Sequence, residues 1–379
     1  MELELTEEQK LLQRTLRDFA HKEILPGIAE RDLKGEFPWR IIQSLARLGL
    51  MGLLVPETYG GIGTDYLTYT LAVEELARFD ASVTLTVSAH NSLCLSHIYK
   101  FGTEEQKRQF LPPLARGECL GAWALTEPQA GSDASALETT AIPKGDKWIL
   151  NGRKVFITQG SLAEVYVVMA STDKSKGRGG ISAFVVEKGT AGLSVGRREE
   201  KLGMRCSDTA ELILEDCTIP RDNLLGRLNG GYMDFLEVLE GGRIGIGAMA
   251  VGIARGCLEE ALKYSKQREQ FGRPICDFQA IQWMLADMAT EIDAARMLVH
   301  KAAWLKDQGK RCPLEASQAK LFASEVAMRA ATKAVQIFGG YGYMKDYHVE
   351  RYFRDAKLCE IGEGTSEVQR LVISKELLK

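Results

Sequence analysis

The sequence lacks the features that mark several common classes of protein. Its formal net charge is −3, whereas a protein that coats nucleic acid needs a clear basic excess. The longest uncharged apolar stretch, residues 244–254, is far shorter than the roughly 20 residues that cross a bilayer. We therefore expect neither a nucleic-acid partner nor a membrane span.

Cysteine and histidine are not arranged as metal ligands or as a disulfide framework. The eight cysteines form no Cys-x-x-Cys pair, and the five histidines form no His-Glu-x-x-His motif. Scattered cysteines are typical of reduced, packed thiols in a reducing compartment. Residues 1–5 resemble neither a secretory nor a transit segment. We expect no metal site and a cytoplasmic protein.

The pattern of apolar residues changes twice along the chain. The first part has helical spacing and two capping boxes, at residues 6–9 and 103–106. Residues 123–219 contain short β-branched and aromatic runs separated by turn residues, which is typical of strands. Within them Asn151-Gly152 predicts a hairpin turn, because both turn positions need positive φ. Helical spacing returns from about residue 231. The pattern predicts an α+β multidomain protein with domains at residues 1–120, 121–230 and 231–379.

One glycine-rich segment matches a nucleotide-binding pattern without its context. Residues 245–250 fit the G-x-G-x-x-A fingerprint, but no strand precedes them and no acidic ribose ligand follows. Small residues in a helical stretch also allow close helix packing. We favour packing over a nicotinamide site.

Glu363 is the strongest candidate for a catalytic side chain. It stands between Gly362 and Gly364, and glycine lets the backbone approach a ligand closely. Residues 366–369 form a capping box headed by Ser366, so a helix begins just beyond. A carboxylate on such a loop suits a general base beside a phosphorylated cofactor. Taken alone, these residues favour the simpler interpretation of an exposed acidic turn.

Five segments, in this order, resemble motifs of the acyl-CoA dehydrogenase family. They are WALTEPQAGSD from Trp123, NGRKVFITQG from Asn151, REQFGRP from Arg268, QIFGGYGY from Gln336 and the final EGTSEVQR. The resemblance covers essentially the whole chain. It implies a helical N-terminal domain, a central antiparallel β-domain and a C-terminal four-helix-bundle domain, assembled as a homotetramer.

The resemblance also implies roles for individual residues. Contacts with FAD are expected for Trp123, Leu125, Thr126, Ser132, Phe156, Thr158, Arg268, Gln270, Phe271, Gln279, Gln336, Gly340, Thr365 and Glu367. Of these, Arg268, Gln270, Phe271 and Gln336 match residues that reach the FAD of a neighbouring subunit. Contacts with the acyl-CoA substrate are expected for Ser132, Glu240, Arg243, Gly362 and Gly364.

The activity implied is α,β-dehydrogenation of an acyl-CoA thioester to the trans-2-enoyl-CoA. Glu363 would take the α-proton, and the β-hydride would pass to N5 of FAD. Hydrogen bonds to the thioester oxygen and desolvation of the base would assist proton removal. The physiological electron acceptor expected from the family is an electron-transferring flavoprotein.

Three positions depart from the family's usual pattern. Gly242 occupies the place that carries the base in some branches, which leaves Glu363 as the one candidate. Gly362 stands where straight-chain enzymes have tyrosine, so a short branched or cyclic acyl group is expected. Gln159 replaces the usual asparagine, without an evident reason in the sequence. The alternatives are a dehydrogenase of straight short or medium chains and an acyl-CoA oxidase.

Overall fold

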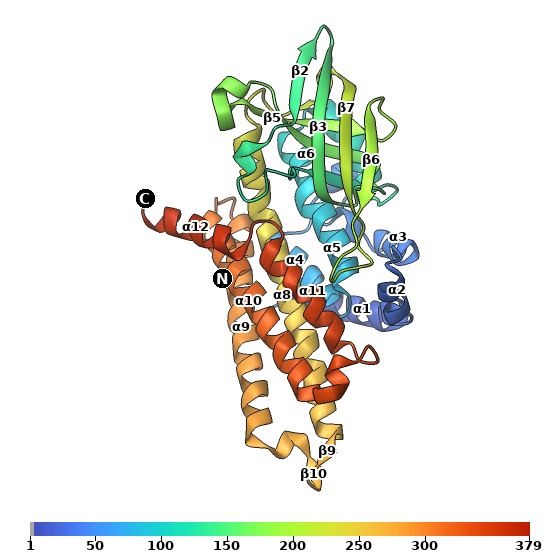
Figure 1. The fold of residues 1–379 in the computed structure, drawn as a ribbon, viewed down its shortest axis with the longest axis vertical. Helices are drawn as coiled ribbons and strands as arrows, with labels where there is room; N and C mark the ends of the chain where they lie inside the picture. The colour runs from blue at the N-terminus through green and yellow to red at the C-terminus, as the bar shows by residue number, and fades with distance from the viewer. Residues whose placement is uncertain (1–3) are drawn as a thin grey trace.

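The computed structural model describes residues 4–379, and Figure 1 shows their arrangement. A β-sheet lies at one end of the molecule, and long C-terminal helices extend to the other end. The N-terminal helices pack beside the junction of the two. The predicted order of helical, β and helical segments is therefore confirmed.

The N-terminal part is built from short helices that bury most of their surface. Both predicted capping boxes are present, with Thr6 and Thr103 as the N-caps. Every residue of the fifth helix and of the π-helical turn after it is buried, so these segments form the centre of the molecule. The elements are α1 (Glu7–Phe19), η1 (Ala20–Ile24), α2 (Ile28–Lys34), α3 (Trp39–Arg47), α4 (Tyr66–Ala77), α5 (Ala81–Ala89), η4 (His90–Leu95), α6 (Ser96–Phe101) and α7 (Glu104–Ala115).

The central part is a mixed sheet in the order β6-β7-β3-β2-β4-β5-β8, with β1 beside β4. The prediction of an antiparallel sheet is wrong at two places, because β1 and β2 both pair with β4 in parallel. The β2–β3 hairpin lies between β1 and β4 in the chain, and it supplies the long connection that a parallel pair requires. The strands are β1 (Gly121–Ala124), β2 (Thr140–Lys144), β3 (Lys147–Thr158), β4 (Val165–Ser171), β5 (Ile181–Glu187), β6 (Leu193–Arg198), β7 (Thr209–Pro220) and β8 (Leu224–Leu225).

The hairpin predicted at Asn151-Gly152 is also wrong. Strand β3 continues through both residues, and its pairing with β7 shifts register there, as in a β-bulge. A Cβ on Gly152 would overlap Thr139, so the glycine serves a close approach of two strands. The turn between β2 and β3 falls instead at Gly145, where φ is 61°.

Long helices form the C-terminal part, and α8 is its central element. Gly245 of α8 faces the hydroxyls of Tyr69 and Ser88, and Gly247 faces Val299 of the next helix and the backbone of Ala319. The G-x-G-x-x-A segment therefore permits close helix packing, as we favoured. The elements are α8 (Gly231–Gln267), β9 (Glu269–Gln270), β10 (Arg273–Pro274), α9 (Gln279–Asp307), α10 (Pro313–Phe338), α11 (Val349–Ile361) and α12 (Ser366–Leu377).

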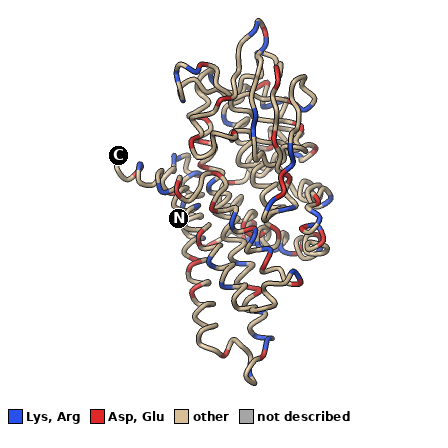
Figure 2. Tube along the Cα trace, in the orientation of Figure 1, with Lys and Arg blue, Asp and Glu red and all other residues tan. Residues whose placement is uncertain are grey.

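Charged residues of both signs are interspersed along the chain in Figure 2. Among residues 4–379, none of the helices combines the length and apolar character needed to cross a membrane. The same residues hold no group of His, Cys, Asp and Glu side chains that could bind a metal ion. All eight cysteines are free thiols.

Candidate active site

Glu363 lies on a tight turn between α11 and α12. Its φ is 54°, and Gly364 follows with φ 95°. A side chain in this left-handed region costs about 1–2 kcal/mol, so the surrounding structure must hold Glu363 there. Thr365, with its hydroxyl accepting from the N–H of Val368, caps α12. The predicted cap at Ser366 is thus one residue late.

Two buried side chains hold the carbonyls of this turn. The ammonium of Lys320, from α10, donates to the Gly364 carbonyl at 2.7 Å. The side-chain amide of Gln369 donates to the same carbonyl at 2.8 Å and to the Glu363 carbonyl at 3.2 Å. Neither side chain was predicted from the sequence. The signal that was available is one lysine among the alanines that α10 buries.

The carboxylate of Glu363 points into the protein against α8. Its Oε2 atom is buried and has no hydrogen-bond partner within residues 4–379, although the residue as a whole remains partly accessible. A Cβ on Gly242 would overlap this oxygen, so α8 must carry glycine there. Burial raises the pKa of Glu363 to about 7, while Lys320 and Arg243 act in the opposite direction. A carboxylate of this basicity can accept a proton near neutral pH.

Arg243 and Glu240 lie one helical turn apart on α8 and are both buried. The guanidinium of Arg243 donates to Ser317 at 3.4 Å, and its Nε has no partner in the described part of the chain. Glu240 is engaged by Lys306 at 3.2 Å and by Arg311 at 2.6 Å. This geometry favours an electrostatic role for Arg243 near Glu363 and a structural role for Glu240.

Several residues expected to contact FAD lie where β1 and β3 face the helices. The indole of Trp123 donates to His97 at 3.0 Å, and the Val155 amide donates to the Thr126 carbonyl at 2.9 Å. Phe156 has φ 59° and its side chain is 65% exposed. An apolar ring that a strained backbone holds at the surface is suited to contact with a planar cofactor.

A buried ion pair connects β3 to the loop that follows β1. Lys154 and Glu127 are 2.7 Å apart, and their side chains are almost completely buried. Lys154 also donates to the Leu125 carbonyl at 3.1 Å, while Glu127 accepts from the amides of Glu138 and Thr139. The pair thus ties β3 to the segment that carries Leu125 and Thr126. Sequence reasoning missed it, because only the fold brings the two charges together.

Gln159, whose identity the sequence left unexplained, connects β3 to α5. Its backbone has φ 64°, and its buried side-chain amide donates to the Thr86 carbonyl at 2.7 Å. Asparagine would be one methylene shorter and could not span the same gap without movement. The glutamine therefore helps to hold the sheet against the central helix.

A second group of predicted FAD contacts lies at the far end of the helices, around the β9–β10 hairpin in Figure 1. A groove of about 540 Å³ there includes Arg268, Gln270 and Gly340 in its lining. Phe271 is 94% exposed, and a Cβ on Gly340 would meet no atom within 4 Å. Within one chain, this group lies far from the turn between α11 and α12 that carries Glu363 in Figure 1.

The other residues expected to contact FAD lie on several elements. Ser132 lies on an exposed loop, and Gln279 is the first residue of α9. Gln336 lies in the last turn of α10, and Glu367 lies in the first turn of α12.

These two groups fit the chemistry of FAD in different ways. The Phe156 region offers an exposed aromatic face and backbone groups beside a strand end. The hairpin region offers a guanidinium, an amide and open space beside glycine, which suit phosphate and ribose. Residues of both groups would be needed to hold a dinucleotide as long as FAD.

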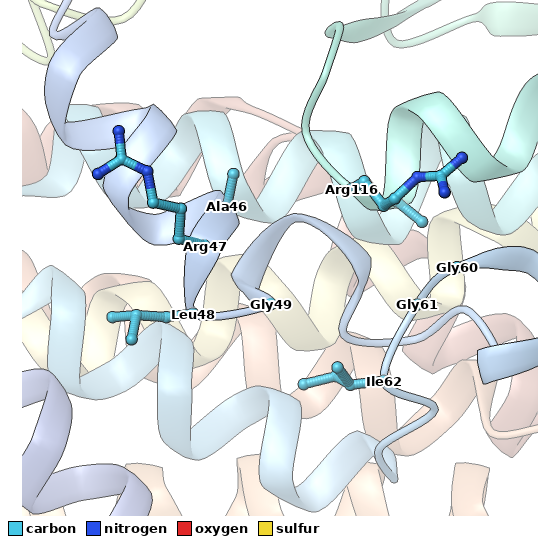
Figure 3. Close-up of a pocket in the computed structure, with 9 residues that line it drawn as sticks. Ala46, Arg47, Leu48, Gly49, Gly60, Gly61, Ile62 and Arg116 are labelled. Atoms are coloured by element: carbon cyan, nitrogen blue, oxygen red, sulfur yellow. The ribbon is translucent and has the colours of Figure 1, made fainter.

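A separate hollow of about 410 Å³ lies between the ends of α3 and α7, and Figure 3 shows the residues that line it. It is lined by Ala46, Arg47, Leu48, Gly49, Gly60, Gly61, Ile62, Ala115 and Arg116. The two arginine side chains point away from each other in Figure 3. These lining residues include no carboxylate, thiol or imidazole, so proton abstraction has no base there.

Comparisons with known proteins agree on one family. Models of the N-terminal, middle and C-terminal domains of acyl-CoA dehydrogenases match residues 6–118, 122–217 and 229–378. The chain is 49% identical to the short-chain specific acyl-CoA dehydrogenase of Clostridium acetobutylicum, and the match covers 100% of both chains.

Two solved structures are similar over the full length. Butyryl-CoA dehydrogenase from Megasphaera elsdenii has a TM-score of 0.98 and 49% identity, with 100% of both chains covered. A chain from work on the electron transferring flavoprotein of Acidaminococcus fermentans and flavin-based electron bifurcation has a TM-score of 0.98 and 53% identity, with 100% of both chains covered.

Proposed function

This chain belongs to the acyl-CoA dehydrogenase family of FAD-dependent oxidoreductases, and we propose that it dehydrogenates a short acyl-CoA with Glu363 as the base. The observation that carries the proposal is the Glu363 carboxylate itself. Its Oε2 atom is buried without a hydrogen-bond partner among the described residues, the turn that carries it has a left-handed backbone, and burial raises the pKa of Glu363 to about 7.

Each of the chain's own residues would have a distinct role in the dehydrogenation. Glu363 accepts the α-proton of the thioester, and its backbone N–H is available to donate to the thioester oxygen. Gly242 leaves the space that the carboxylate occupies, and Arg243 and Lys320 favour its ionised form. When bound, FAD supplies the acceptor for the hydride that leaves the β-carbon. Orientation of the bound partners is the main contribution of the protein.

We assign the FAD site to two subunits. The isoalloxazine side would be held by Trp123, Leu125, Thr126, Phe156 and Thr158 of one chain, with Ser132, Thr365 and Glu367 nearby. The hairpin group of a neighbouring chain would hold the remainder, with Arg268, Gln270, Phe271, Gln279, Gln336 and Gly340. The separation of the two groups within one chain in Figure 1 supports a site shared between subunits, and we propose a homotetramer because the family resemblance implies one. Light scattering that shows a stable, fully flavinylated monomer would contradict it.

The acyl group is proposed to be short, with tolerance for a branch or ring near the α- and β-carbons. Gly362 has φ −64° and ψ 150°, which any residue can adopt, and the atoms nearest to a Cβ there would be those of Leu358, at 3.5 Å or more. Backbone geometry therefore does not require glycine, which supports a role in pocket volume. A straight-chain preference is the alternative, since the relatives reported above include a butyryl-CoA dehydrogenase.

Electrons are proposed to leave through an electron-transferring flavoprotein, in keeping with the similar chain from work on the electron transferring flavoprotein of Acidaminococcus fermentans. The competing function is an acyl-CoA oxidase, in which oxygen accepts the electrons. Peroxide released under air in proportion to enoyl-CoA formed would favour the oxidase. Turnover that requires an added electron carrier would favour the dehydrogenase.

The base assignment is tested with Glu363→Gln, which keeps the shape of the side chain and removes its basicity. FAD content and acyl-CoA binding should persist, while turnover falls by about 10²–10⁴-fold. Glu376→Gln near the C-terminal end of α12 is a matched control, because Glu376 pairs only with Lys379 in the described chain. A Glu363→Gln enzyme that keeps most of its activity would place the base elsewhere.

The substrate proposal is tested with Gly362→Tyr and a panel of linear, branched and cyclic acyl-CoAs. The bulky ring should lower kcat/KM for branched substrates much more than for butyryl-CoA. A wild-type preference for linear chains, or equal losses for both kinds in the variant, would show that Gly362 does not select the substrate.

A further inference from the structure

Lys320 is a fully buried lysine with a single hydrogen-bond acceptor. Its side chain is 0% exposed in the middle of α10, and its ammonium donates to the Gly364 carbonyl at 2.7 Å. Within residues 4–379 it has no carboxylate within ion-pair distance. Burying an ammonium that is not directly paired is costly, so its presence beside the Glu363 turn calls for a compensating role.

The titratable groups around Lys320 and Glu363 come from three other helices. Arg243 of α8 and Tyr69 of α4 lie near the carboxylate, and Cys359 and Glu360 of α11 lie near the ammonium. Glu363 is the acid of this group whose buried oxygen has no hydrogen-bond partner in the described chain. A positive charge at Lys320 therefore acts chiefly to favour ionisation of Glu363 and to hold its turn.

Gln369 allows the effect of the charge of Lys320 to be distinguished from the effect of its hydrogen bond to the turn. Its neutral amide donates to the Gly364 carbonyl at 2.8 Å, beside the Lys320 bond to the same atom. Both side chains therefore restrain the turn, in which Glu363 and Gly364 have φ of 54° and 95°. Only Lys320 adds a charge. Loss of either tether should disturb the position of the base, whereas loss of the charge should also alter its basicity.

We propose that Lys320 is a positioning residue for the base, with its ammonium both tethering the Glu363 turn and stabilising the ionised carboxylate. The inference rests on the proposed function of Glu363. It assigns to α10 a part in proton abstraction, through the backbone of Gly364 and through its electric field. Burial lowers the pKa of Lys320 to about 8, so the side chain still carries its proton at pH 7.

The test compares Lys320→Gln with Gln369→Leu in the FAD-loaded enzyme. Lys320→Gln keeps an N–H donor and removes the charge, so the acid limb of kcat/KM against pH should move upward by about one pH unit or more. Gln369→Leu removes a neutral tether, so kcat should fall while the acid limb stays in place. Lys320→Arg, which keeps the charge, should restore the wild-type limb.

Protonation of Glu363 can also be followed without turnover. The infrared carboxyl band that is absent from Glu363→Gln should titrate at higher pH in Lys320→Gln than in wild type. If Lys320→Gln does not fold, Lys320→Met places an apolar chain of similar length in the same site and should give the same upward movement with a lower kcat.

Two results would overturn the inference. One is an unmoved acid limb and an unmoved infrared titration in Lys320→Gln or Lys320→Met. The other is Lys320→Arg moving the limb as far as Lys320→Gln does. Failure of the proposed function looks different, because Glu363→Gln would then retain wild-type rates whatever the behaviour of the Lys320 variants.

Discussion

Replacing Glu363 by glutamine should change the stability of the protein in a way that depends on pH. Burial raises the pKa of Glu363 from its ordinary value of 4.5 to about 7. Below pH 4.5 the side chain is protonated in both folded and unfolded chains, and above pH 7 it is ionised in both. Between these limits the folded chain binds more protons, so this group's contribution to stability falls as pH rises.

The size of the effect follows from the difference in pKa. At about 1.4 kcal/mol for each pH unit, the wild-type chain should lose up to about 3 kcal/mol of unfolding free energy through this group. Glutamine cannot ionise and so avoids the loss. Relative to wild type, Glu363→Gln should therefore gain stability progressively between pH 4.5 and about 7 and keep the gain above it.

Urea unfolding of FAD-saturated protein at pH 5, 6, 7 and 8 would measure the difference. Glu367→Gln is the matched control, four residues further along the chain. Backbone N–H at the start of α12 and the Thr365 hydroxyl lower the pKa of Glu367 below its ordinary value of 4.5. Glu367 is therefore ionised in both the folded and the unfolded chain from pH 5 to 8, and the difference in unfolding free energy between Glu367→Gln and wild type should not vary with pH over this range. A flat difference between Glu363→Gln and wild type across this range would refute a raised pKa at Glu363.

Three further substitutions test the supporting contacts. Gly242→Ala places a Cβ on the Glu363 carboxylate and should lower kcat by about 100-fold, which is the order of loss for a misplaced catalytic group. The value of kcat is measured at saturating substrate, and the FAD content of the variant should be unchanged. Lys154→Met leaves Glu127 as a buried charge without its partner and should cost about 3–5 kcal/mol in urea unfolding, much of it recovered when Glu127 is also replaced by methionine. Gln159→Asn loses the bond to the Thr86 carbonyl and should lower the unfolding free energy by about 1 kcal/mol; an unchanged midpoint and slope would show that this bond contributes nothing.

Local signals in the chain were enough to predict the features that neighbouring residues produce. The capping boxes at Thr6 and Thr103 are confirmed, because each depends on groups three residues apart. The alternation of helical and strand periodicity predicted the three-part fold, since burial of one face imposes that period on each segment. The five ordered motifs predicted the family.

Pairing between distant segments was beyond the reach of such signals. Asn151-Gly152 has the composition of a hairpin turn, but β7 pairs with β3 on both sides of it and makes it a bulge. The sheet is mixed because the chain returns after the β2–β3 hairpin as β4, which lies beside β1. The composition of the strands does not specify this pairing. The cap of α12 falls at Thr365, one residue before the predicted Ser366.

The properties of Glu363 likewise depend partly on local sequence and partly on tertiary packing. The family motif marked the residue as a candidate base, but a carboxylate between two glycines, taken alone, favours an exposed acidic turn. Tertiary packing is what buries its oxygen against Gly242 of α8 and brings Lys320 of α10 to the adjacent carbonyl. Desolvation and nearby charge set the basicity of a carboxyl group, and both arise from helices that are remote in the chain. The motif that marks Glu363 as the candidate base is therefore local information, whereas the basicity of its carboxylate is a property of the folded molecule.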